Sequence, residues 1–201
     1  MKKIFFVMLL ILIAVATTGV YHLTQQADIC YYKGHDLFVK SQYKASIPFF
    51  LRSLSYDPKQ IQTLSELGYA YLWSGSPKEA IQVFQKLLPL ESGSTRVKKS
   101  LAMAYSWNKE YVKAETILQE AIREDKNDRD AQRGLAEVYI WDHKFDEAKS
   151  LLTAFLKNNP GDVRARLLYG KALLYSGQTK EALQIFQELL KRSKEAAAEN
   201  V

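Results

Sequence analysis

The order of apolar and polar residues predicts amphipathic helices along most of the chain. In one stretch the apolar side chains follow the i, i+3, i+4, i+7 spacing of a single helical face: Ala80, Ile81, Phe84, Leu87 and Leu88. Turn-forming residues interrupt such stretches at Ser74-Gly75-Ser76-Pro77, Asn108-Lys109, Asp142-His143 and Ser176-Gly177. Short helices joined by tight turns are therefore expected.

The helical pattern repeats every 34 residues. Two positions are small in every unit: Gly34, Gly68, Ala102, Ala136 and Gly170, and then Ser46, Ala80, Ala114, Ala148 and Ala182. A third position is large and apolar, as Phe50, Phe84, Leu118, Leu152 and Phe186. Small residues let two helices approach closely, and large residues fill the remaining gaps. The pattern predicts five units, 27–60, 61–94, 95–128, 129–162 and 163–196, followed by a tail, 197–201.

This arrangement resembles the tetratricopeptide repeat family, whose pattern is W-x2-L-G-x2-Y, then A-x3-F, then P. The resemblance covers 170 of the 201 residues, with departures such as Lys33 in place of the leucine of the first unit. It implies an all-α protein, a right-handed α-solenoid of five helix pairs in which stacking of neighbouring pairs forms the core. It also implies that the first helix of each pair lines a concave groove.

The N-terminus has the composition of an export signal. Lys2 and Lys3 precede an uncharged apolar run over residues 4–20, and Ala14-Val15-Ala16 fits a small-x-small cleavage site. The run is also about the shortest that can span a bilayer. Two alternatives are open for residues 1–26: a cleaved signal peptide or an uncleaved membrane anchor, followed in either case by a linker. Both place the repeats outside the cytoplasm, in the periplasm or tethered to the inner membrane.

Aromatic residues recur at the thirteenth position of consecutive units. This position, which the resemblance places in the groove, reads Val39, Trp73, Trp107, Trp141 and Tyr175. The rings either pack between neighbouring helices or form a stacking surface for a ligand, such as sugar rings or an extended peptide. The second interpretation is favoured because core positions two residues earlier already hold Tyr71, Tyr105 and Tyr139.

Basic residues gather at groove positions of the third to fifth units: Arg96, Lys99, Arg133, Arg164 and Lys171. Together with Tyr69 and the four aromatic residues at the thirteenth position, they are the candidate binding residues. A basic groove suits an acidic peptide, a C-terminal carboxylate or an anionic polymer. The alternative is an ordinary solvated face in which Glu137 and Asp130 balance the charge.

The Tyr-x-Trp sequences at 71–73, 105–107 and 139–141 are similar to repeats of bacterial exopolysaccharide-export and cellulose-synthesis scaffold proteins. This resemblance implies a second possible function, as a polysaccharide-binding or scaffold component of exopolysaccharide synthesis or export.

The composition argues against several other classes of protein. The net charge is +6, and it falls to +4 if Lys2 and Lys3 are removed with the signal, so a nucleic-acid partner is not expected for an exported chain. Cys30 is the only cysteine and cannot form an intrachain disulfide or a cysteine-rich zinc site. The three histidines, His22, His35 and His143, lack a metal-ligand spacing. No catalytic site, metal site or cofactor is therefore expected.

The sequence thus predicts an exported, non-enzymatic scaffold that holds a protein or peptide partner in a concave groove. No capping helix follows the last unit, so Leu183, Phe186, Leu189 and Leu190 would remain uncovered. This edge is expected to associate with a partner or a second copy, or to fray.

Overall fold

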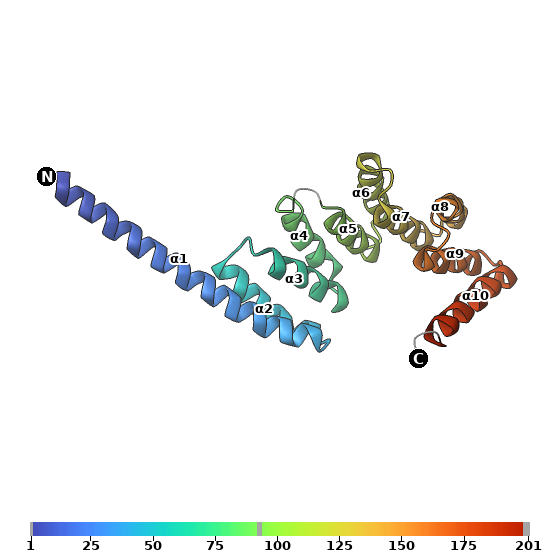
Figure 1. Ribbon diagram of the computed structural model, residues 1–201, viewed down its shortest axis with the longest axis horizontal. Helices are drawn as coiled ribbons and strands as arrows, with labels where there is room; N and C mark the ends of the chain where they lie inside the picture. The colour runs from blue at the N-terminus through green and yellow to red at the C-terminus, as the bar shows by residue number, and fades with distance from the viewer. Residues whose placement is uncertain (1, 92–93, 199–201) are drawn as a thin grey trace. The chain divides into compact units, whose positions relative to one another are not determined.

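Ten helices and no strand make up the part of the chain that the computed structural model describes, residues 2–91 and 94–198. The chain divides into two compact units, Met1–Ser92 and Gly93–Val201. Unit 1 contains α1 (Lys2–Val39), α2 (Tyr43–Tyr56), α3 (Ile61–Trp73) and α4 (Pro77–Leu87) (Figure 1). Unit 2 contains α5 (Thr95–Trp107), α6 (Tyr111–Glu124), α7 (Arg129–Trp141), α8 (Phe145–Asn158), α9 (Val163–Tyr175) and α10 (Thr179–Ala198). The predicted all-helical class is confirmed.

First and second helices of the repeat pairs alternate along the chain. The first helices of successive pairs, α3, α5, α7 and α9, each have 13 residues and begin 34 residues apart. Because only a short turn separates the two helices of a pair, they lie side by side and run in opposite directions. Within unit 2, α7 packs against both α5 and α9, so these three first helices form one continuous surface.

The turns inside the pairs share one backbone conformation. The second residue of each turn has a positive φ, and these residues are Ser41, Gly75, Lys109, His143 and Gly177. The following amide donates to the carbonyl five residues earlier, as the Ser76 amide does to Tyr71 at 2.8 Å. This is a Schellman helix ending, which satisfies carbonyls left open at the C-terminus of the first helix. Glycine adopts this conformation without strain, which accounts for Gly75 and Gly177.

Each pair is held together by a close contact between its small eighth position and its large twenty-fourth position. Three repeats combine glycine with phenylalanine (Gly34 with Phe50, Gly68 with Phe84, Gly170 with Phe186), and two combine alanine with leucine (Ala102 with Leu118, Ala136 with Leu152). A Cβ atom at Gly68 would lie 2.5 Å from Cε1 of the buried Phe84 ring. The larger ring therefore requires the smaller partner.

The N-terminal helix is longer than the sequence pattern predicts. α1 runs without interruption from Lys2 to Val39, and its first part extends beyond α2 (Figure 1). Residues 21–26, expected to be a linker, continue the helix because neither glycine nor proline occurs between Gly19 and Gly34. Within the described ranges, no helix combines the length and the apolar character needed to cross a membrane.

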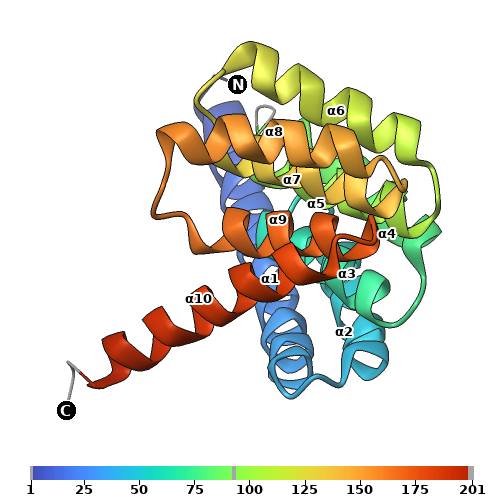
Figure 2. The same cartoon turned by 90° about the vertical axis from the view of Figure 1, so that its right-hand side faces the viewer.

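The C-terminal helix is also long. α10 has 20 residues, whereas α2, α6 and α8 each have 14. It therefore continues past α9 (Figure 2) and includes the first two residues of the expected tail. Residues 199–201 of that tail lie outside the described residues.

We expect Gly68→Ala to lower the free energy of unfolding by about 1–3 kcal/mol, because the added methyl group overlaps the Phe84 ring. Adding Phe84→Leu should restore most of this loss, since the double variant recreates the alanine–leucine combination of two other repeats. Denaturant unfolding of the single and double variants measures both effects.

The control is Gly161→Ala, where a Cβ atom would meet no atom within 4 Å. Simple additivity of the two single losses in the double variant would contradict the expected compensation.

Candidate functional site

A pocket of about 440 Å³ opens between α7 and α9 in unit 2. Its apolar lining includes Ile140 and Leu168, which are both almost fully buried. Three aromatic side chains also line it: Trp141, Phe145 and Tyr175. Its polar lining consists of Glu137, His143 and Lys171. A volume of this size, with an apolar interior and a few polar groups, is typical of a ligand-binding pocket.

The repeat geometry brings the aromatic residues of this pocket together. Trp141 and Tyr175 are the last residues of α7 and α9, so they occupy the same place in two stacked pairs. Phe145 is the first residue of α8, and its ring lies 6.3 Å from that of Tyr175. Tyr175 is 59% exposed and Trp141 is half-buried, so both rings keep accessible surface. Two of the four aromatic residues at the thirteenth position therefore line one pocket.

Opposite charges line the same pocket one turn before the aromatic residues. Glu137 on α7 and Lys171 on α9 occupy the ninth position of their repeats. The Glu137 side chain is half-buried and has no hydrogen bond or ion pair with any described residue. Burial raises the pKa of its carboxyl group, and four nearby cations partly oppose that effect: Lys99, Lys171, Arg133 and Arg164. Glu137 thus lies at the centre of the predicted basic cluster.

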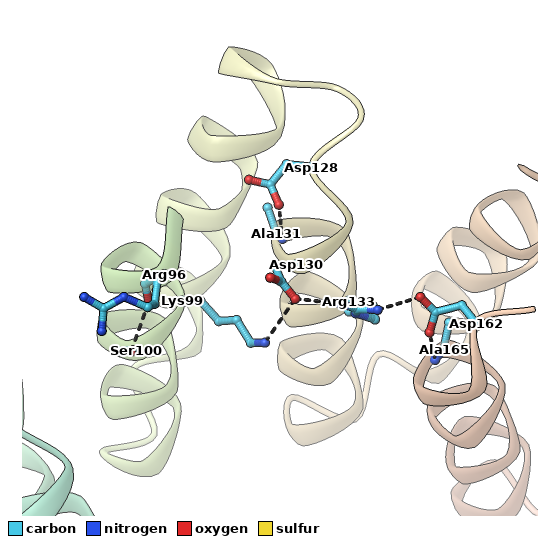
Figure 3. Close-up of polar contacts among 9 residues, drawn as sticks. All are labelled: Arg96, Lys99, Ser100, Asp128, Asp130, Ala131, Arg133, Asp162 and Ala165. Atoms are coloured by element: carbon cyan, nitrogen blue, oxygen red, sulfur yellow. Dashed lines mark hydrogen bonds and ion pairs between the residues drawn. The ribbon is translucent and has the colours of Figure 1, made fainter. Parts of the chain in front are cut away.

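Part of that basic cluster is neutralised by aspartates. Figure 3 shows Lys99 on α5 and Arg133 on α7 both pointing toward Asp130, with Arg133 also reaching Asp162. The two arginine contacts are 2.5 Å long and the lysine contact is 3.6 Å. The hydrogen bond from Arg133 lowers the pKa of the Asp130 carboxyl group. Asp162 also accepts a hydrogen bond from the Ala165 amide and so caps α9. Arg133 is therefore a structural link between α7 and α9.

Two other cations remain available. Lys171 and Arg164 are exposed and form no ion pair with the described residues. Arg164 occupies the repeat position that the acidic Asp130 occupies one unit earlier. It lines a second, more polar cavity of about 520 Å³ beside the 158–163 loop. Arg96 is exposed at the start of α5 and does not line the aromatic pocket.

The remaining predicted residues have different surroundings. In unit 1, Trp73 lies 4.9 Å from Tyr43, 5.4 Å from Phe38 and 5.3 Å from Tyr69, measured between ring centroids. Tyr69 also packs edge-on against Phe84 at 5.4 Å. These contacts make Trp73 and Tyr69 part of an aromatic cluster, although Trp73 stays 45% exposed.

Trp107, at the end of α5, is 44% exposed and has no aromatic neighbour among the described side chains. The aromatic positions therefore do not form a uniform surface: Trp73 packs in a cluster, Trp107 stands alone, and Trp141 and Tyr175 line a pocket. Ligand binding by these residues stays a prediction.

Sequence reasoning missed several residues that line the pocket. Phe145 was overlooked, although aromatic residues also begin the second helices of two other repeats, as Tyr43 and Tyr111. His143 is expected from the sequence only in a turn and without a metal-ligand spacing, yet it lines the pocket. The described His, Cys, Asp and Glu side chains form no group of three or more that could hold a metal ion.

Helix pairs that recur every 34 residues, with small and large residues at fixed positions, define an α-helical repeat protein. The sequence model of the tetratricopeptide repeat family matches residues 107–154 and 142–200. Residues 107–200 therefore carry repeats of the tetratricopeptide family, whose members are generally non-catalytic scaffolds for protein–protein interaction. No curated protein matches the sequence.

Several solved structures share the fold. The MamA protein is 26% identical with a TM-score of 0.63, and the match covers 88% of this chain and 97% of that chain. A tetratricopeptide repeat protein from Parabacteroides merdae has a TM-score of 0.75 at 14% identity, covering 82% and 64%. YrrB, described as having an unusual peptide-binding site, has a TM-score of 0.56 at 19% identity, covering 87% and 90%.

We expect Glu137→Gln to stabilise the protein at pH 7. Because the pKa of Glu137 is raised in the folded state, the protonated carboxyl group favours folding. This contribution to the free energy of unfolding is lost as the pH rises through the pKa of the folded state. The neutral glutamine avoids that loss, so its advantage in thermal unfolding should disappear below about pH 4, where the wild-type carboxyl is also protonated. Glu120→Gln, on the exposed face of α6, is the control. An equal effect of Glu137→Gln at pH 4 and pH 7 would contradict the expected linkage.

Proposed function

We propose that this protein is an exported, non-catalytic scaffold that binds an extended segment of a partner protein in the pocket between α7 and α9. The observation that carries the proposal is the convergence of three aromatic rings with the available Lys171 in one open pocket. A few residues carry most of the binding free energy at protein interfaces, and tryptophan and tyrosine in desolvated pockets are enriched among them. The peptide-binding site named for YrrB, a protein of the same fold, is consistent with this role.

The lining residues favour a particular kind of segment. Ile140, Leu168 and the aromatic rings would contact an apolar side chain inserted between α7 and α9. Lys171 and Arg164 would attract acidic residues beside that side chain, since neither cation is paired within the described residues. Arg133 and Lys99 contribute less, because Asp130 and Asp162 already compensate their charge. The preferred partner segment is therefore apolar at its centre and acidic at its flanks.

A glycan is the second candidate ligand. The exposed faces of Trp107 and Tyr175 favour it, since sugar rings stack on such surfaces. This role would make the protein a component of exopolysaccharide synthesis or export.

The proposed export rests on the sequence of the N-terminus. Two lysines, an apolar run and a small-x-small site are the parts of a secretory signal, and they lead to a periplasmic location for the repeats.

The peptide proposal is tested by fluorescence anisotropy with two labelled synthetic peptides. Each has a central tryptophan, flanked by glutamates in one and by lysines in the other. We expect the acidic peptide to bind more tightly, and Trp141→Ala to weaken it at least about tenfold through loss of a pocket wall. Lys171→Glu should reverse the preference between the two peptides, because it inverts the charge beside the pocket.

Trp107→Ala is the matched control, since Trp107 does not line the pocket. Equal losses for Trp107→Ala and Trp141→Ala would contradict a peptide site at this pocket. Binding of an oligosaccharide, with neither peptide bound, would favour the glycan instead.

A further inference from the structure

The two ends of the repeat array expose surfaces that the internal repeats bury. At the third position of the repeat, Thr63, Ala131 and Ala165 are fully buried, whereas Ile29 on α1 is 48% exposed. At the sixth position, Gly134 and Leu168 are buried, whereas Tyr32 is 65% exposed. The internal residues are covered by the second helix of the preceding pair, whereas no described helix covers the corresponding face of α1. One face of α1 is therefore an unused stacking surface.

The last helix has the complementary property. Leu118 and Leu152 are buried at the twenty-fourth position of their repeats, but Phe186 in α10 is only half-buried. Leu183 and Leu190 in the same helix are 54% and 57% exposed. In the internal repeats the first helix of the following pair covers this face. Within residues 94–198, no following first helix covers this face of α10, and α1 has the open face of a first helix.

Contacts between internal repeats define how such a pair of helices would align. The Tyr139 hydroxyl donates to Glu115 at 3.3 Å, which joins the eleventh position of one repeat to the twenty-first of the repeat before it. A Cβ atom at Gly134 would lie 3.3 Å from Leu118, joining the sixth to the twenty-fourth.

The hydroxyls of Ser53 and Thr63 are 3.2 Å apart, which joins the twenty-seventh position of one repeat to the third of the next. Successive contacts therefore run in opposite directions along the two helices, as in antiparallel packing.

Transferring this alignment to the two ends gives three apolar pairs. Leu183 falls opposite Leu37, Phe186 opposite Tyr32, and Leu189 opposite Ile29. The same alignment also places Lys191 near Asp28, and these two residues carry opposite charges. In this antiparallel alignment the added parts of the two helices lie beside each other, because α10 is extended at its C-terminus and α1 at its N-terminus. The exposed Tyr21 and Leu23 lie in that added part of α1.

We propose that the open face of α10 binds α1 of a second copy of this chain, head to tail, in the alignment used between internal repeats. Each copy then uses a different surface at each end, so the interaction is heterologous and adds further copies unless a ring closes. The internal interfaces supply the reason for this choice of occupant, since a first helix of the same repeat type packs against each of α2, α6 and α8.

The test uses two full-length variants, Leu189→Lys and Ile29→Lys, each of which alters one end only. We expect the wild-type chain to form concentration-dependent oligomers larger than dimers in analytical ultracentrifugation. Each variant alone should be monomeric, with association weakened at least about tenfold by burial of an unpaired charge. An equimolar mixture should form dimers and nothing larger, because one variant keeps an intact α1 face and the other keeps an intact α10 face.

Leu51→Lys is the matched control, because Leu51 is an exposed leucine of α2 that lies beside residues of α3 and α4, outside the aligned positions of α1 and α10. This variant should associate like the wild type, and circular dichroism checks that all three variants are folded. A strictly monomeric wild-type chain would overturn the proposal. So would self-association of either single variant, which would indicate a symmetric contact, or a mixture of the two that remains monomeric.

Discussion

The close contact between the eighth and twenty-fourth positions of each repeat sets the distance between its two helices. Where the eighth residue is glycine, the phenylalanine ring occupies the space that a Cβ atom would take, as Phe84 does beside Gly68. Where it is alanine, a leucine takes the place of the ring, as in Ala102 and Leu118. Both solutions fill a similar volume at high packing density. Helices of constant spacing can then stack in one register, which places the ninth and thirteenth positions of neighbouring first helices beside one another.

This dependence explains why so much of the fold could be predicted. The 34-residue period contains both the helix boundaries and the buried positions, since each is determined within a pair or between adjacent pairs. The positive φ of one residue in each turn is also determined locally, by the ending of the first helix. In the sequence, only the glycines Gly75 and Gly177 indicate this conformation. Ser41, Lys109 and His143 adopt the same conformation because the helix ending requires it. The sequence predicts a signal or anchor helix at the N-terminus, but its composition does not reveal that this helix continues without a break into the first repeat.

The candidate site could be predicted less well, because a period identifies positions but not their partners. Arg133 and Lys171 both looked like groove cations, yet two aspartates bind Arg133 and no described residue pairs with Lys171. One of those aspartates, Asp162, comes 29 residues later and doubles as a helix cap. Trp73 and Trp141 likewise hold one repeat position, but the rings of Phe38 and Tyr43 surround only Trp73. Such differences arise from the residues that vary between repeats.

The proposed partner site and the proposed contact between copies use different positions of the repeat. The pocket uses the ninth and thirteenth positions of α7 and α9, where a charge and an aromatic ring can vary without changing helix spacing. The end surfaces lie at positions that form the interfaces between internal repeats, and in α10 they include Leu183 and Leu190, which face solvent. Apolar side chains gathered on one exposed helix face lower solubility unless another surface covers them. A chain that keeps apolar residues at both ends, and extends both terminal helices, retains the surfaces needed for stacking. Because the pocket and the end surfaces share no residue, a partner could bind each copy in an assembled chain.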